Sequence, residues 1–212
     1  MGRSSGLLSG IRVLDLTQTV AGPFGSMILG DLGAEVIKIE HPKNPDVARS
    51  TPPHFIKGES VYFFSLNRNK QSLALDLKHP AGRDIFEALA KKSDVVFHNF
   101  RPGTMERLGI GYNRLRRLNP RLVFCALTGY GLTGPWRSKP GYDYVIQALS
   151  GMMSITGEPG GPPVKTGISM VDHVGGLYSA LGVIAALWRR QTTGRGELVD
   201  VGLLDTQMSL FT

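Results

Sequence analysis

Cysteine is almost absent from this 212-residue chain, which contains only Cys125. A single cysteine cannot form a disulfide within the chain, and it has no companion ligands for zinc. It stands in the apolar run 122–127, which predicts a buried strand residue in a protein of a reducing compartment. The five histidines are far apart and show no ligand spacing, so the sequence predicts no metal site.

Long apolar runs are also missing. Residues 1–6 contain no apolar core of the kind that a signal peptide needs. The most apolar later stretch, 177–188, is shorter than the roughly 20 residues with which a helix crosses a bilayer. We therefore expect a cytoplasmic protein with no membrane partner.

Basic residues outnumber acidic ones, 24 against 17, which gives a formal net charge of +7. Such an excess favours anionic ligands, although it also serves solubility. The densest basic cluster, 107–121, lacks the interleaved aromatic residues of a single-strand binder and any helix-turn-helix pattern. A discrete phosphate-bearing ligand is therefore expected in preference to nucleic acid.

Strand-like and helix-like segments alternate along the chain. Strands are expected at 11–16, 35–40, 72–77, 94–98, 122–127 and 198–201. Helices are expected from Ala21 to Gly33, from Pro80, at 105–108, 112–118, 144–149, 172–191 and 203–210. This alternation predicts an α/β fold, a Rossmann-like parallel sheet with flanking helices. The irregular segment 128–165 is long for a compact domain, and such segments often carry function.

A glycine-rich segment, Gly129–Gly134, fits the pattern G-x-G-x-x-G after a predicted strand. A dinucleotide site also requires a helix that begins at the motif. Pro135 and Pro140 follow instead, with no helical pattern between them, so a glycine-rich turn is the preferred interpretation.

Asp172 stands at the predicted start of the longest helix. By pattern alone, a helix-capping role is the preferred interpretation, since aspartate is a favoured N-cap residue. The same position also suits a nucleophile, because the helix dipole and free N–H groups would keep the carboxylate ionised at neutral pH. His173 is expected to be structural, since adjacent helical residues point about 100° apart.

Several blocks of the sequence together resemble the family III coenzyme A transferases, the group of formyl-CoA and carnitine CoA-transferases. The blocks are spread over nearly the whole chain in the family's order: 15–23, 32–40, 67–72, 99–103, 129–134, 141–143 and 193–196. The resemblance implies a Rossmann-like domain, an interlaced homodimer and no cofactor, with coenzyme A acting as a substrate. Members of the family are longer, so residues 1–212 correspond to the N-terminal part of an incomplete large domain whose C-terminal portion is absent.

The resemblance also implies a mechanism and a set of site residues. Asp172 matches the catalytic aspartate, which exchanges CoA between an acyl-CoA and a carboxylic acid through an aspartyl anhydride and an aspartyl-CoA thioester. Residues at the family's CoA contacts are Leu75, Lys78, Asn99, Phe100, Arg107 and Leu108. Residues at the acyl site are Gln18, Val20 and Tyr142.

Two alternatives remain open from the sequence. The related α-methylacyl-CoA racemases place a histidine where this chain has Tyr142, and racemisation needs a second acid/base group for which tyrosine is a poor substitute. A non-catalytic CoA-binding or assembly module is the other alternative, favoured by the missing C-terminal portion.

Overall fold

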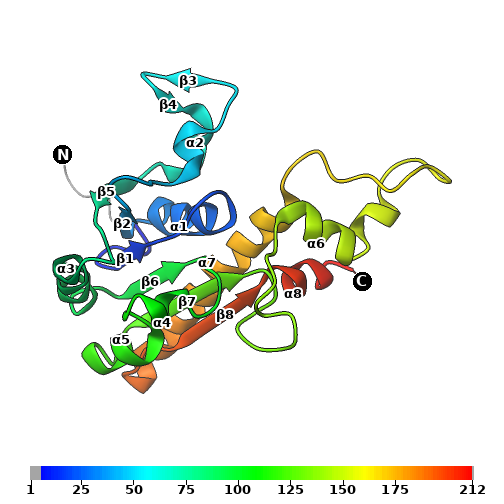
Figure 1. The fold of residues 1–212 in the computed structure, drawn as a ribbon. Coiled ribbons are helices and arrows are strands. Elements are labelled where there is room, and N and C mark those ends of the chain that lie inside the picture. The colour runs from blue at the N-terminus through cyan, green and yellow to red at the C-terminus, as the bar shows by residue number, and fades with distance from the viewer. Residues whose placement is uncertain (1–5, 212) are drawn as a thin grey trace.

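The computed structural model describes residues 6–211, so the predicted lack of a signal segment at residues 1–5 lies outside the described part. Its main sheet has six strands in the order β5-β2-β1-β6-β7-β8, and every neighbouring pair is parallel. Figure 1 shows this sheet crossing the molecule. The strands are β1 (Arg12–Asp15), β2 (Glu35–Glu40), β5 (Lys70–Ala74), β6 (Val95–His98), β7 (Val123–Thr128) and β8 (Leu198–Gly202). The predicted Rossmann-like sheet is confirmed, and its order is that of the dinucleotide-binding folds.

Helices cover both faces of the sheet. They are α1 (Ala21–Asp31), α2 (Val61–Asn67), α3 (Pro80–Ala90), α4 (Thr104–Arg107), α5 (Tyr112–Leu118), α6 (Asp143–Leu149), α7 (Met170–Thr193) and α8 (Leu203–Met208). Two short 3₁₀ turns, Val47–Ser50 and Met152–Ile155, lie in the longer connections. A small antiparallel hairpin, β3 (Phe55–Ile56) and β4 (Glu59–Ser60), projects with α2 from the body of the molecule (Figure 1). The hairpin and α2 were not among the predicted elements.

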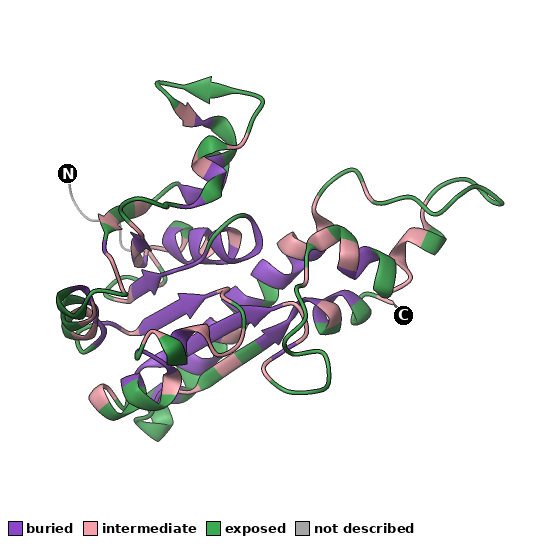
Figure 2. Ribbon diagram, in the orientation of Figure 1, coloured by how far each residue is buried: buried purple, intermediate pink, exposed green. Residues whose placement is uncertain are grey.

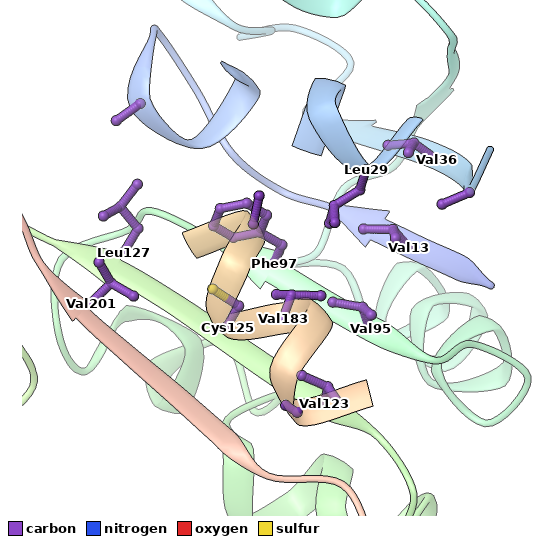
Figure 3. Close-up of a cluster of buried hydrophobic side chains, with 14 of the residues drawn as sticks. Val13, Leu29, Val36, Val95, Phe97, Val123, Cys125, Leu127, Val183 and Val201 are labelled. Atoms are coloured by element: carbon purple, nitrogen blue, oxygen red, sulfur yellow. The ribbon is translucent and has the colours of Figure 1, made fainter. Parts of the chain in front are cut away.

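Successive residues of each central strand enter two different cores, because side chains alternate across a strand. Val13, Val95 and Val123 pack with α1 and α7, whereas the next residue of each strand packs with α3 and α5. Figure 3 shows α7 lying across the first of these cores. Burial is concentrated in the sheet and on the inner sides of the helices (Figure 2). The unbroken apolar runs of β6 and β7 therefore reflect burial on both faces.

Helices α1 and α7 approach each other very closely. A Cβ atom added to Gly176 would lie 2.6 Å from the carbonyl oxygen of Ala21, and one added to Gly25 would lie 2.8 Å from the carbonyl oxygen of Gly176. Neither glycine has room for a larger side chain. This contact brings the N-terminal ends of both helices to the same edge of the sheet.

Helix α7 has 24 residues and a mean hydropathy of 1.4 in its most apolar window, so length and composition alone would allow it to cross a bilayer. Half of that window is buried inside the protein. Near its C-terminal end the buried Arg190 forms an ion pair of 2.9 Å with Asp94, which precedes β6. These contacts are those of a helix packed into a protein core.

Candidate active site

A pocket lies where the order of the sheet reverses. The chain runs from β1 outward to β2 and β5, and then returns to place β6 on the other side of β1. In open α/β sheets, ligands bind in the crevice outside the carboxyl ends of the strands at this point. A cavity of about 480 Å³, pocket A, lies there. The residues that line it include Gln18, Asn99, Phe100, Tyr142, Asp143 and Asp172.

Asp172 is part of the pocket A lining, but it is not the N-cap of α7. The helix begins at Met170, and Ser169 is its N-cap residue. The preference of aspartate for capping positions did not predict this start. Val171 is buried, so the helix and its buried face begin before the predicted start at residue 172. Asp172 is therefore the third helical residue, and the expected capping role is wrong.

The backbone around Asp172 is held by a second carboxylate. Asp143, the first residue of α6, accepts a hydrogen bond of 3.2 Å from the Asp172 N–H through Oδ2. Its Oδ1 accepts another, of 2.5 Å, from the side-chain amide of Gln147. Gln147 is fully buried, and its Oε1 accepts a hydrogen bond of 2.9 Å from the N–H of Thr166. Gln147 thus joins α6, the segment before α7 and the neighbourhood of Asp172.

Asp143 lies in one of the blocks that resemble the family, but no role was predicted for it, and Gln147 is not among the residues predicted from the sequence. The available signal was their spacing of four residues on a predicted helix, which places the two side chains on one face. Their link to Asp172 depends on a contact across 29 positions of the chain. That contact is not visible in any local pattern.

Burial, and then the charge of Asp143, raise the pKa of Asp172 from 3.8 to about 7. The sequence predicted the opposite direction, because the position near a helix N-terminus favours the anion. Desolvation and a like charge outweigh that effect here. About half of the Asp172 side chains are consequently ionised near pH 7, and a perturbed carboxyl group beside a cavity is a frequent mark of a functional site.

The loop after β1 is fixed on two sides. Asn99, which follows β6, accepts a hydrogen bond of 2.8 Å from the N–H of Gln18 and donates one of 2.8 Å to its carbonyl oxygen. On the other side, the buried Lys38 donates to the carbonyl oxygen of Thr17 and to Asp46. Asp46 in turn accepts a hydrogen bond of 3.0 Å from the N–H of Thr19. The backbone at Gln18 therefore has a defined position at the edge of pocket A.

A second buried ion pair, between Lys70 and Asp15, supports the start of the same loop. Lys70 lies 3.0 Å from Asp15, and both side chains are buried. Burial lowers the pKa of Lys70 to about 8 despite the nearby carboxylate. Burial alone would raise the pKa of Asp15, but Lys70 and Lys38, with hydrogen bonds from two hydroxyl groups, lower it. Asp15 thus stays ionised and accepts hydrogen bonds from the Thr17 N–H and hydroxyl.

A second cavity, pocket B, has a volume of about 380 Å³ and shares Asp143 with pocket A. Its lining includes Val20, Tyr62, Lys165 and His173. Burial, followed by the charges of Asp172 and two further carboxylates, raises the pKa of Tyr62, so its hydroxyl group is protonated at neutral pH. Val20 is one of the residues predicted at the acyl site, whereas Tyr62 and Lys165 are not among the residues predicted from the sequence.

The structure brings together only some of the predicted site residues. Gln18, Asn99, Phe100, Tyr142 and Asp172 meet in pocket A, and Val20 lines pocket B. The other four predicted CoA contacts line neither cavity: Leu75 and Leu108 pack in the core under α3 to α5, while Lys78 and Arg107 are exposed. Their roles in CoA binding stay predictions.

Two further sequence expectations concern ligands. Within residues 6–211, no group of three or more histidine, cysteine, aspartate or glutamate side chains is placed to hold a metal ion. The Gly129–Gly134 segment follows β7, and no helix begins until α6 at Asp143. Gly129 instead packs against Gly141, where an added Cβ would lie 2.7 Å from the Gly141 Cα. The segment is an irregular loop, and its first residue, Gly129, lines pocket A.

Comparison with known proteins identifies the family. The model of CoA-transferase family III matches residues 8–212. The chain is 45% identical to the mouse succinyl-CoA:glutarate CoA-transferase over 205 residues, which are 97% of this chain and 47% of that protein. It is 44% identical to the acetyl-CoA:oxalate CoA-transferase of Acetobacter aceti, covering 96% of this chain and 52% of that protein. The chain belongs to CoA-transferase family III, and it spans about half the length of the curated relatives it matches.

A solved structure agrees with this assignment. A CAIB/BAIF family protein from Brucella suis superimposes with a TM-score of 0.94 at 37% sequence identity. The match covers 98% of this chain and 56% of the Brucella protein. The predicted family and the incomplete α/β domain are therefore confirmed.

Proposed function

We propose that this chain provides the nucleophile and one wall of an active site that transfers coenzyme A from an acyl-CoA to a carboxylic acid. The observation that carries the proposal is the position of Asp172, whose carboxyl group lines pocket A beside Asn99, Phe100 and Gln18. The cavity is open to solvent at the edge of the sheet, where a pantetheine chain can enter. The named relatives are CoA-transferases, which supports this chemistry.

In the proposed reaction, an ionised Asp172 oxygen attacks the thioester carbonyl of the donor. The C–S bond breaks, CoA leaves as the thiolate, and a mixed anhydride remains. The thiolate then attacks the aspartyl carbonyl, which releases the donor acid and forms an aspartyl-CoA thioester. This covalent route divides one difficult exchange into easier steps.

The acceptor completes the exchange. Its carboxylate attacks the aspartyl thioester to give a second anhydride and free thiolate, and the thiolate attacks the acceptor's acyl carbon. The products are the acceptor-CoA and the regenerated Asp172 carboxylate. Each step passes through a tetrahedral oxyanion, for which backbone N–H groups are suitable donors. The first turn of α1 offers such groups, since Ala21 also lines pocket A.

Trapping the intermediate tests the proposal. Full-length protein that contains residues 1–212 is mixed with succinyl-CoA and quenched with hydroxylamine, and the peptide that carries Asp172 is examined by mass spectrometry. The expected product is a hydroxamate on Asp172, absent in Asp172→Asn. Transfer activity without any adduct at this residue would refute the nucleophilic role. The racemase alternative is separated by following the α-proton of a 2-methylacyl-CoA, which transfer leaves in place.

A further inference from the structure

Pocket B adjoins pocket A near Asp172 and contains neither Asn99 nor Phe100 in its lining. Asp143 lines both cavities, and His173 of the pocket B lining directly follows Asp172 on α7. Asp172 lines pocket A alone, so if CoA occupies pocket A, an acid in pocket B can approach Asp172 only past the shared Asp143. Pocket B is therefore the available space for the acid.

One cation stands in this cavity. Lys165 is the only lysine or arginine that lines pocket B. Its ammonium group donates to the neighbouring Thr166 carbonyl oxygen at 3.3 Å, and it forms no ion pair with any carboxylate among residues 6–211. The one carboxylate of the lining, Asp143, is already engaged by Gln147 and the Asp172 N–H. Lys165 thus presents a positive charge without a fixed anionic partner.

The position of Lys165 relative to Asp172 is set by a buried group. The next residue, Thr166, donates its N–H to Gln147, and the same Gln147 side chain donates to Asp143, which accepts from the Asp172 N–H. These three hydrogen bonds connect the backbone beside the lysine to the backbone of the nucleophile. The fold therefore fixes the backbone at Lys165 relative to the backbone at Asp172.

We propose that Lys165 is a specificity-determining residue that binds the second carboxylate of a dicarboxylic acid acceptor. The inference rests on the proposed function, and it adds the class of acceptor. One carboxylate of the acceptor faces the acylated Asp172, and the other pairs with the Lys165 ammonium in pocket B. The hydroxyl of Tyr62 lines the same cavity and supplies a neutral donor. Glutarate and oxalate, which the names of two relatives contain, are acids of this class.

The test compares acceptors with one and two carboxylates. Full-length protein and its Lys165→Met variant are given succinyl-CoA with oxalate, malonate or glutarate, and with valerate, which replaces one glutarate carboxylate by a methyl group. Loss of a charge-assisted hydrogen bond is expected to raise the KM of the best dicarboxylate about tenfold. The KM of valerate is expected to stay unchanged, and Lys165→Arg should restore most of the dicarboxylate preference.

Lys91→Met is the matched control. Lys91 is an exposed lysine at the end of α3, at the opposite edge of the sheet, so its loss should leave both acceptors unaffected. Equal effects of Lys165→Met on glutarate and valerate, or a wild-type protein that does not prefer any dicarboxylate, would overturn the assignment.

Binding measured without turnover separates this inference from the proposed function. Ligand-observed NMR records the binding of oxalate, malonate, glutarate and valerate to the wild type and to Lys165→Met in the presence of CoA. Selective loss of dicarboxylate binding in the variant supports the role of Lys165, even if no CoA transfer is detected. Dicarboxylate binding that is unchanged in the variant, or absent from the wild type, overturns it. A wild type that transfers CoA but binds acceptors without regard to Lys165 would refute the inference and leave the proposed function standing.

Discussion

Replacing Asp172 by asparagine is expected to stabilise the folded protein, by an amount that depends on pH. The folded protein raises the pKa of this carboxyl group from 3.8 to about 7, chiefly through burial. A group with a raised pKa binds its proton more tightly in the folded than in the unfolded state. Wild-type stability should therefore fall as pH rises from about 4 through about 7, because the folded state must then hold a desolvated anion. Asparagine cannot ionise, so the variant does not lose free energy of unfolding at this position over the same pH range.

The size of the effect follows from the shift. Each pKa unit corresponds to about 1.36 kcal/mol, so the full shift corresponds to about 4 kcal/mol. The Asp172 side chain is partly exposed and its charge is screened by solvent, which lowers the expectation to about 2–4 kcal/mol at pH 8. Below pH 4 both proteins carry a neutral group at this position, and their stabilities should converge.

Urea denaturation followed by circular dichroism, repeated between pH 4 and pH 8, measures the difference directly. Asp84→Asn, at an exposed position of α3, is the control. The difference in free energy of unfolding between this variant and the wild type should not increase with pH across this range. A stability difference between Asp172→Asn and wild type that is constant with pH would show that Asp172 is not held as a desolvated acid. The reasoning about its ionisation would then be wrong.

Two further outcomes are expected. The acid limb of the pH dependence of kcat/KM should be centred near pH 7 in the wild type, since the proposed reaction requires an ionised Asp172. Asp143→Asn should move this limb to lower pH by removing a like charge. A pH–rate profile that does not move would contradict this coupling. Lys38→Met should destabilise the fold by about 3–5 kcal/mol, because it leaves the fully buried Asp46 carboxylate without its partner. Urea unfolding measures that loss, with the exposed Lys43→Met as a control, and equal midpoints for the two variants would refute it.

Much of the fold could be predicted because its signals are local. The alternating strand 11–16 and the proline at the start of α3 each report a preference within a few residues. The expected strand at 72–77 was displaced, and the pairing with β2 occurs at Lys70–Ala74. Register in that strand depends on its neighbour, which is distant in sequence. The hairpin was missed because residues 41–57, where its first strand lies, offer polar and proline-rich composition with no periodic pattern. Helix α2 lies in residues 58–71, for which no element was predicted.

The dimeric state and the cellular location stay predictions, since contacts within residues 6–211 of one chain test neither of them. The same is true of the CoA contacts assigned to Lys78 and Arg107, which are exposed and line neither pocket. Exposed basic side chains can reach a ligand phosphate by rotating, so their position in the free protein does not decide their role.

The parallel α/β architecture, the family and the choice of Asp172 as candidate nucleophile could be read from the sequence, because they follow from periodicity and from motifs in a fixed order. The ionisation of Asp172 depends instead on the packing of the folded chain. Helix position favours an ionised Asp172, but burial and the carboxylate of Asp143, which is 29 positions away, raise its pKa. Likewise, Lys165 shares a cavity with Tyr62 and His173 only through the folding of α2, α7 and an irregular loop onto one another. Desolvation and long-range charge are properties of the packed chain, and no local pattern of residues contains them.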